Sequence, residues 1–274
     1  MPRTADQPAT QPDGGTSWVA VGLPTEHGGW SLTLEPVLLG LLVAPSWAGL
    51  TIGLSTVAAF LVRHPAKLYW RNRHRLNLSP RFRIARRFAV GYILVAGVAL
   101  AVAVRLAGWE PLIPFLVLAP ALAVYAAYDA SNQTRRLLPE LVAPMGLAAS
   151  APAIAIAGGW SWPAAAALWL ILQLRAIPSI LYVRARLRLE RGEEIDRRPS
   201  SYSHLAAFAA GAALWAVELG PLLTVTFLVI LLLRAGQGLS PGRKPAKAKQ
   251  VGFSELAFGL GYVLATVIGF GLGV

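Results

Sequence analysis

Apolar runs of membrane length recur along this chain and are separated by loops rich in arginine and lysine. Of its 274 residues, 55% are hydrophobic and 14% are charged, whereas a soluble domain carries roughly 25% charged residues. Because a helix crosses a bilayer with about 20 mostly apolar residues, the sequence predicts an all-α, polytopic membrane protein with about nine transmembrane helices. The predicted spans are 28–45, 47–63, 88–106, 111–128, 140–158, 162–182, 203–218, 220–234 and 252–272.

The basic residues gather on one side of this predicted topology. Loops after the second, fourth, sixth and eighth spans hold 22 of the 25 lysines and arginines, whereas the opposite loops contain Arg105. Since cytoplasmic loops are enriched in basic residues, we expect the N-terminus to lie in the cytoplasm and the C-terminus outside. The same bias explains the net charge of +12, so no nucleic-acid partner is expected, and the bilayer itself is the first partner.

Composition also divides the chain. Residues 1–23 are rich in Pro, Gly, Thr and Gln and predict a disordered cytoplasmic tail. They lack a basic segment followed by a short apolar core, so no cleavable signal peptide is expected. Residues 24–274 are predicted to form a single transmembrane helical domain. With no cysteine and four scattered histidines, the chain is expected to hold no metal.

A nine-residue pattern, Leu-Tyr-x-Arg-x-Arg-x-Arg-Leu, occurs at 68–76 and again at 181–189. Each copy follows a long apolar run, at the ends of the second and sixth predicted spans. Glu35 and Glu140, each close to a proline and a Gly-Leu pair, precede the two copies, and Glu255 opens the ninth span in a similar context. The repeated arginine pattern and the similar sequences around these glutamates predict an internal duplication that relates spans 1–4 to spans 5–8. The simpler alternative is that the two copies are alike by chance, because a tyrosine at the membrane interface followed by arginines in a cytoplasmic loop is common at the ends of spans.

The arginines of this pattern favour an anion. If the helices continue past the membrane surface, Arg71 and Arg75 share one face, as do Arg184 and Arg188 after Tyr182. Arginine suits phosphate because its planar fork binds two oxygens and keeps its charge. The sequence therefore predicts an anion-binding mouth where the ends of the second and sixth spans meet. Contact with anionic lipid head groups is the alternative.

Two charged residues fall deep within predicted spans. Glu35 lies in the first span and Arg175 in the sixth. A charge at mid-span costs at least ~2.5–3.5 kcal/mol on insertion scales, so it normally faces a cavity or a partner. Pairing of the two with each other is the favoured interpretation. The alternative makes Glu35 a base or proton carrier and Arg175 a substrate ligand.

Polar residues at the cytoplasmic rim complete the predicted site. Glu140 opens the fifth span, where a carboxylate also stabilises the helix dipole. No catalytic residue is identified. The candidate substrate-binding residues are Glu26, His27, Glu35, Arg63, His64, Arg71, Arg75, Asn132, Arg175, Tyr182, Arg184 and Arg188.

Four short motifs resemble the YwiC-like family of bacterial integral membrane proteins. They are Pro24-Thr-Glu-His-Gly-Gly-Trp, Pro36-x-x-x-Gly40, Arg63-His64-Pro65 and Leu138-Pro139-Glu140. The resemblance covers almost the whole chain and implies a multi-pass protein of the bacterial inner (plasma) membrane. It implies no established biochemical role.

A more distant resemblance, to the UbiA superfamily of membrane prenyltransferases, rests on the nine spans, the cytoplasmic N-terminus and the loops after spans two and six. It implies helices arranged around a central cavity that opens sideways to lipid. In that superfamily, aspartate-rich loops bind Mg²⁺ and a polyprenyl diphosphate. Here the loop at 63–87 contains no Asp or Glu, although Mg²⁺ on a diphosphate needs oxygen ligands. Standard prenyl transfer is therefore not expected, Mg²⁺ is expected only if UbiA-like chemistry is retained, and enzymatic activity stays open.

Three functions fit these observations. The favoured hypothesis is binding or processing of an anionic lipid, such as a phosphorylated isoprenoid, in an arginine-lined cavity that faces the cytoplasm. A small-anion transporter is the second, supported by Glu35, Arg175 and the Pro- and Gly-interrupted spans. A membrane assembly factor is the third. A lateral opening beside the arginines favours the lipid, whereas a path sealed from lipid through Glu35 and Arg175 favours transport.

Overall fold

The computed structural model describes residues 18–23, 27–71 and 80–274, and every secondary-structure element in these ranges is helical. The prediction of an all-α protein is confirmed for this part of the chain. The elements are α1 (Trp18–Gly22), α2 (His27–Val43), α3 (Trp47–Arg71), α4 (Pro80–Ala107), η2 (Glu110–Leu112), α5 (Ile113–Val117), α6 (Ala119–Ala130), α7 (Leu137–Leu147), α8 (Ser150–Ala157), α9 (Trp162–Glu190), α10 (Arg198–Ala216), α11 (Leu222–Gly238) and α12 (Ala248–Leu272).

Only some of these helices have the length and hydropathy of a membrane span. Among the described residues, four segments qualify: Phe82–Ala107, Leu137–Ala157, Trp162–Glu190 and Ala248–Leu272. A fifth is obtained if Glu110–Val117 and Ala119–Ala130, which bend by 49° at their junction, count as one. Helices α2 and α11 are apolar but shorter. The apolar helices indicate a membrane-inserted protein with four or five candidate spans, fewer than the nine predicted.

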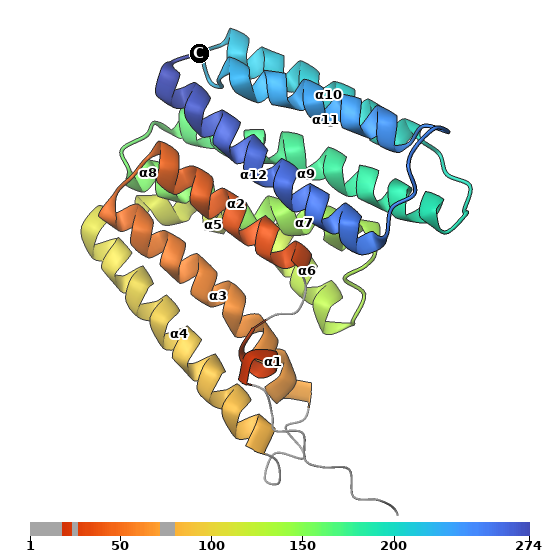
Figure 1. Cartoon of the computed structure of the whole chain (residues 1–274). Helices are drawn as coiled ribbons and strands as arrows, with labels where there is room; N and C mark the ends of the chain where they lie inside the picture. Colours follow the sequence, from red (N-terminus) through yellow and green to blue (C-terminus); the bar gives the residue numbers. More distant parts are fainter. Residues whose placement is uncertain (1–17, 24–26, 72–79) are drawn as a thin grey trace, which may run out of the picture.

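The helices form two outer pairs around a central group (Figure 1). Helix α3 packs against α4 along one side of the molecule, and α10 packs against α11 on the opposite side. Between them lie α2, α8, α9 and α12, with α2 in contact with both α8 and α12. Segments far apart in the sequence are thus brought together in the middle of the bundle.

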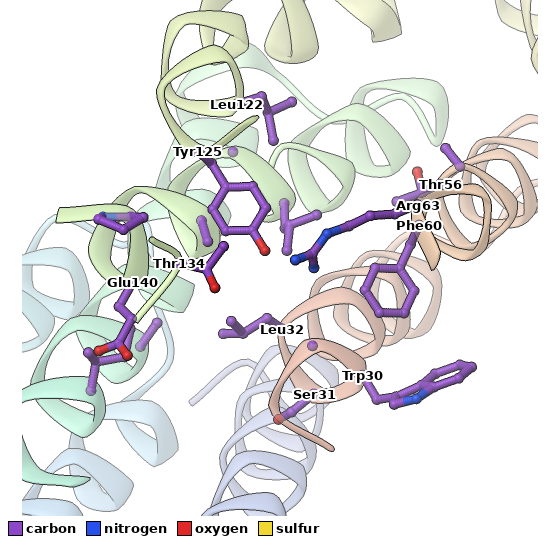
Figure 2. Close-up of a pocket in the computed structure, with 18 of the residues that line it drawn as sticks. Trp30, Ser31, Leu32, Thr56, Phe60, Arg63, Leu122, Tyr125, Thr134 and Glu140 are labelled. Carbon is purple, nitrogen blue, oxygen red and sulfur yellow. The ribbon is translucent and has the colours of Figure 1, made fainter. Parts of the chain in front are cut away.

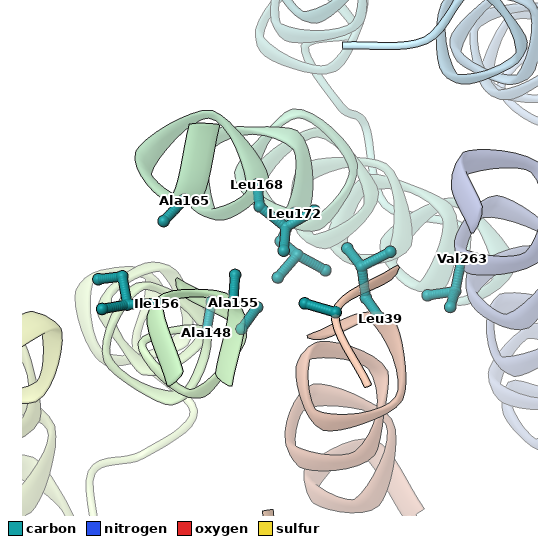
Figure 3. Packing of buried hydrophobic residues seen from close by; sticks show 10 residues of the cluster. Leu39, Ala148, Ala155, Ile156, Ala165, Leu168, Leu172 and Val263 are labelled. Carbon is teal, nitrogen blue, oxygen red and sulfur yellow. The ribbon is translucent and has the colours of Figure 1, made fainter. Parts of the chain in front are cut away.

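The core of this central group is built from small and branched side chains (Figure 3). Leu39 of α2, Ala155 of α8, Leu168 of α9 and Val263 of α12 belong to one buried cluster. Helix α8 has the sequence SAPAIAIA, and its alanines let neighbouring helices approach closely, as small residues do between helices in membranes. A Cβ on Gly40 would lie only 2.9 Å from the Cβ of Ile154.

The end of the predicted disordered tail requires a correction. Most of the tail lies outside the described residues, but Trp18–Gly22 form helix α1. The ring of Trp18 packs edge-on against Phe88 of α4 at 6.3 Å, and Val21 is fully buried. The hydroxyl of Tyr92 donates to the backbone oxygen of Gly22 over 3.2 Å. These contacts with α3 and α4 explain why the last residues of the segment are ordered against the bundle.

Helix α12 comes closest to its neighbours at Gly259. A Cβ at this position would overlap the carboxylate of Glu35 on α2 and the guanidinium of Arg175 on α9. We therefore expect Gly259→Ala to lower the free energy of unfolding by about 1–3 kcal/mol, because overpacking displaces both groups. Gly252→Ala on the same helix is the control, since its Cβ would meet nothing within 4 Å. Equal unfolding midpoints for both variants in detergent would contradict the close packing at Gly259.

Candidate functional site

A cavity of about 1680 Å³ lies between α2 and α3 on one side and α6, α7, α9 and the start of α12 on the other. Figure 2 shows Phe60 and Arg63 of α3 facing Leu122 and Tyr125 of α6 across it. Much of its wall is apolar, as at Phe60, Leu122 and Ile180. The volume exceeds the roughly 300–1,000 Å³ of pockets for drug-sized ligands. The cavity is therefore large enough for part of a lipid.

The residues that line the cavity reach from the level of the start of α9 to near its end, and those on α9 itself lie between Arg175 and Leu187. At one end it is lined by Trp109 and Glu110, and Glu110 accepts a hydrogen bond over 2.7 Å from the indole of Trp162, at the start of α9. At the other end it is lined by Arg184, close to the end of the same helix. A long ligand therefore fits this space better than a compact one.

The Arg184 end of the cavity is basic. Besides Arg184, its wall contains Arg63 of α3, Arg135 between α6 and α7, and Lys249 in the first turn of α12, with one carboxylate, Glu140. We call this set the basic end. It brings together helix ends that are up to 186 residues apart in the sequence.

The two arginines of the basic end that lie on long helices are held by carboxylates. Arg184 donates from Nη1 to Oε2 of Glu140 over 2.6 Å and to the backbone oxygen of Arg135 over 3.0 Å. Arg63 donates to both carboxylate oxygens of Asp129 on α6, over 3.2 and 2.9 Å, and its guanidinium lies 5.1 Å from the ring centre of Tyr125. These ion pairs thus hold the side chains of Arg63 and Arg184 in place at the basic end.

The predicted pairing of Glu35 with Arg175 is confirmed. Nη1 of Arg175 donates to Oε2 of Glu35 over 2.7 Å, and the two residues are 4% and 8% exposed. The hydroxyl of Ser31 donates to the other carboxylate oxygen of Glu35. Nη2 of Arg175 donates to the backbone oxygen of Glu255 over 2.7 Å. Arg175 lines the cavity, so this ion pair holds one residue of its inner wall in place.

A second buried pair lies beside the first. Arg234 of α11 forms an ion pair with Glu255 of α12. The guanidinium of Arg234 stacks between the rings of Tyr182, at 4.3 Å, and Phe258, at 5.0 Å. Tyr182 was predicted to bind substrate, but among the residues that line the cavity it does not appear. Its ring instead supports a buried arginine.

The three arginines in the second copy of the pattern lie in three different environments. Arg184 lines the cavity, as predicted. Arg186 is buried, donates to the backbone oxygens of Gly238 and Lys244, and ties the loop before α12 to α9. Arg188 points to solvent and donates to Glu193 over 2.7 Å. The expectation that Arg184 and Arg188 share one binding face is corrected, because Arg188 is not part of the cavity wall.

The exposed loop after α9 is held by its own charges. Glu193 accepts hydrogen bonds from Arg188 and Arg191. These bonds lower the pKa of the Glu193 carboxyl below its usual value. The loop therefore keeps its ion pairs at neutral pH without involving the cavity.

The remaining predicted residues lie elsewhere or outside the described part. Arg71 ends α3 and His27 begins α2, but their side chains are not described. His64 lies in α3, outside the cavity wall. Asn132 is exposed, and its φ of 54° places it in the left-handed region just after α6, where it helps to end the helix. Two residues, Glu26 and Arg75, lie outside the described residues.

The predicted meeting of the two arginine patterns stays a prediction, because the arginine side chains of the first copy are not described. Arg63, five residues before that copy, lines the same cavity as Arg184. Lys249, Ser179 and Arg135 of this wall were not among the candidate substrate-binding residues, and Glu140 was predicted only to stabilise the dipole of its helix. A signal was present for Lys249, which begins an apolar run on the side predicted to be cytoplasmic. Across residues 18–23, 27–71 and 80–274, no three His, Asp or Glu side chains are grouped as metal ligands.

Comparisons with known proteins place part of this chain in a family. Residues 23–155 match the model of a family described as YwiC-like protein, so the family expected from the sequence motifs is shown over this segment. This segment contains α2 to α7 and most of α8, and it contributes Arg63, Arg135 and Glu140 to the cavity. No curated protein and no solved structure matches the chain.

The buried pair provides a test of the inner wall. Arg175→Met leaves the Glu35 carboxylate buried without its counterion, and we expect it to lower the free energy of unfolding by about 3–5 kcal/mol. Glu35→Leu combined with Arg175→Met removes both charges and should recover most of that loss. Unfolding titrations with SDS compare the variants. A double variant as unstable as the single one would show that the ion pair is not what Arg175→Met disrupts.

Proposed function

We propose that this YwiC-like membrane protein binds an anionic lipid, such as a phosphorylated isoprenoid, with the lipid's head group at the basic end of the cavity. One observation carries the proposal: a single cavity combines long apolar walls with four basic side chains at one end. An amphiphile with an anionic head has the same division into an apolar and a charged part. These features support binding, and they are compatible with processing of the bound ligand.

The apolar walls match a hydrocarbon chain. Leu116, Leu122 and Ile180 line the cavity away from the basic end, and burial of apolar surface stabilises by roughly 25 cal/mol per Å². The same walls disfavour a small hydrated anion as cargo, because they offer it few hydrogen-bond donors on the way through. The ion pair between Glu35 and Arg175 further leaves no net charge at the inner wall to attract an anion.

The head group is expected to contact Arg135 and Lys249 first. Both side chains are exposed and line the cavity, and neither forms an ion pair with a carboxylate in the described part of the chain. Arg63 and Arg184 are already neutralised by Asp129 and Glu140. The guanidinium fork of Arg135 suits two phosphate oxygens, and the Lys249 ammonium adds a second positive charge.

The topology proposed with this function has nine crossings. The shorter helices α2 and α11, together with α3 and α10, supply the crossings beyond the four or five candidates. The basic end then faces the cytoplasm by the positive-inside rule, with the C-terminus outside. A bacterial inner membrane and a UbiA-like arrangement belong to the same proposal. The binding site itself uses arginine and lysine, so it requires no Mg²⁺.

The proposal predicts a charge-dependent affinity. Arg135→Gln combined with Lys249→Gln should weaken binding of a polyprenyl phosphate by roughly 10- to 30-fold, at about 1 kcal/mol for each basic contact. Binding to purified protein in nanodiscs is measured against the uncharged polyprenol of equal chain length. Because Arg188 and Arg191 lie outside the cavity wall, Arg188→Gln with Arg191→Gln is the control that removes the same charge.

The control variant should bind the polyprenyl phosphate like the wild type, and the wild type should prefer the phosphate over the alcohol. Equal affinity of the wild type for both compounds, or equal losses in the two double variants, would exclude the basic end as the head-group site.

A further inference from the structure

The loop of residues 239–247 joins α11 to α12 and leads directly to the basic end of the cavity. Its last residue, Lys247, is the N-cap of α12, and Lys249 follows two residues later in the cavity wall. The loop passes beside the end of α9 (Figure 1). The place of Lys249 at the basic end therefore depends on what holds this loop.

Apolar burial contributes little to holding the loop. Leu239 is buried, but none of residues 240–247 is. Three of them are basic and carry like charges: Arg243, Lys244 and Lys247. Since burial of apolar surface is the main force that fixes most segments of a protein, polar contacts have to hold this one.

These polar contacts come from the last turns of α9. Arg186 is 5% exposed, and its guanidinium donates to the backbone oxygens of Gly238 and Lys244. Glu190, four residues later on the same face, forms an ion pair with Arg186 over 3.0 Å. Oε2 of Glu190 accepts a hydrogen bond from the backbone nitrogen of Ala246 over 3.3 Å. Helix α9 thus binds the chain just before the loop and again near its end.

Arg243 adds contacts in the opposite direction, from the loop to α9. Its Nη2 donates to the backbone oxygen of Leu189 over 3.3 Å, and its Nε lies 3.5 Å from Oε1 of Glu190. The same oxygen of Glu190 also pairs with Arg186. We call Arg186, Glu190 and Arg243 the loop anchor. None of the three lines the cavity.

We infer that the loop anchor positions Lys249 for head-group binding. This inference rests on the proposed function, because that function assigns Lys249 a contact with the head group. Ala246, which Glu190 binds, precedes Lys249 by three residues, about one helical turn. Release of the loop would let Lys249 leave the cavity wall, whereas Arg184 lies on α9 itself and would stay. The three anchor residues touch no ligand and act through Lys249.

Arg243→Gln tests the anchor at its least buried arginine. It should weaken binding of a polyprenyl phosphate by roughly 3- to 10-fold, close to the loss of one basic contact. Binding of the uncharged polyprenol of equal chain length should change by less than about 2-fold, because it has no charged head group. Both affinities are measured with the full-length protein in nanodiscs of a zwitterionic phospholipid.

Lys244→Gln is the matched control, because it removes the same charge from the same loop. Its side chain is exposed and outside the cavity wall, and Arg186 binds its backbone oxygen, which the substitution keeps. This variant should bind the polyprenyl phosphate like the wild type. Equal losses in Arg243→Gln and Lys244→Gln would overturn the inference, since loop charge alone would then account for them.

A double-variant cycle shows whether Arg243 acts through Lys249. In a Lys249→Gln background, Arg243→Gln should weaken phosphate binding no further, because the group that it positions is already absent. Losses that add in the double variant would mean that Arg243 acts by another route and would overturn the inference.

The position of the loop is also measured without any ligand. The chain contains no cysteine, so spin labels on Arg188→Cys of α9 and Lys249→Cys of α12 report the distance between the two helices. Arg243→Gln should shift or broaden this distance distribution, whereas Lys244→Gln should leave it unchanged. An unchanged distribution in Arg243→Gln overturns the inference while the proposed function stands. If the distribution changes but wild-type protein binds the phosphate and the alcohol equally, the proposed function is wrong, and the anchor's hold on the loop stands alone.

Discussion

Helix α9 carries two arginines along its inner face, and a carboxylate from a different helix neutralises each of them. Arg175 pairs with Glu35 of α2, and Arg184 pairs with Glu140 of α7. A guanidinium never loses its charge in a protein and is costly within a bilayer, so these pairs favour the positions of α2 and α7 beside α9. The three similar Glu contexts in the sequence all provide such a partner, since Glu255 pairs with Arg234.

The cavity follows from this arrangement. Carboxylates draw α2 and α7 to α9, while α3 reaches α6 only through long side chains, with Arg63 and Lys67 both bound to Asp129. Helices joined by side chains of this length leave space between their backbones. The basic residues at the helix ends then border one end of that space, and apolar residues from the helix interiors line the rest. The ion pairs thus help to set the positions of the helices and of the residues that line the candidate site.

Hydropathy and charge patterns predicted which residues are buried better than they predicted where each side chain points. The all-helical fold, the buried pair of Glu35 and Arg175, and the position of Arg184 at the cavity followed from hydropathy and charge. The directions of Tyr182 and Arg188 did not, because Tyr182 packs against Arg234 of α11 and Arg188 pairs with Glu193 in the loop after α9. The internal duplication stays a prediction.

Identification of the lipid that remains bound to the purified wild-type protein tests the central claim most directly. Native mass spectrometry of the protein, released gently from detergent, gives the mass and stoichiometry of bound molecules, and extraction then identifies them. A cavity with one basic end and apolar walls predicts one tightly held anionic lipid per chain, with a single long apolar part. Protein that carries no lipid, or retains neutral and anionic lipids in proportion to the membrane, would contradict the account.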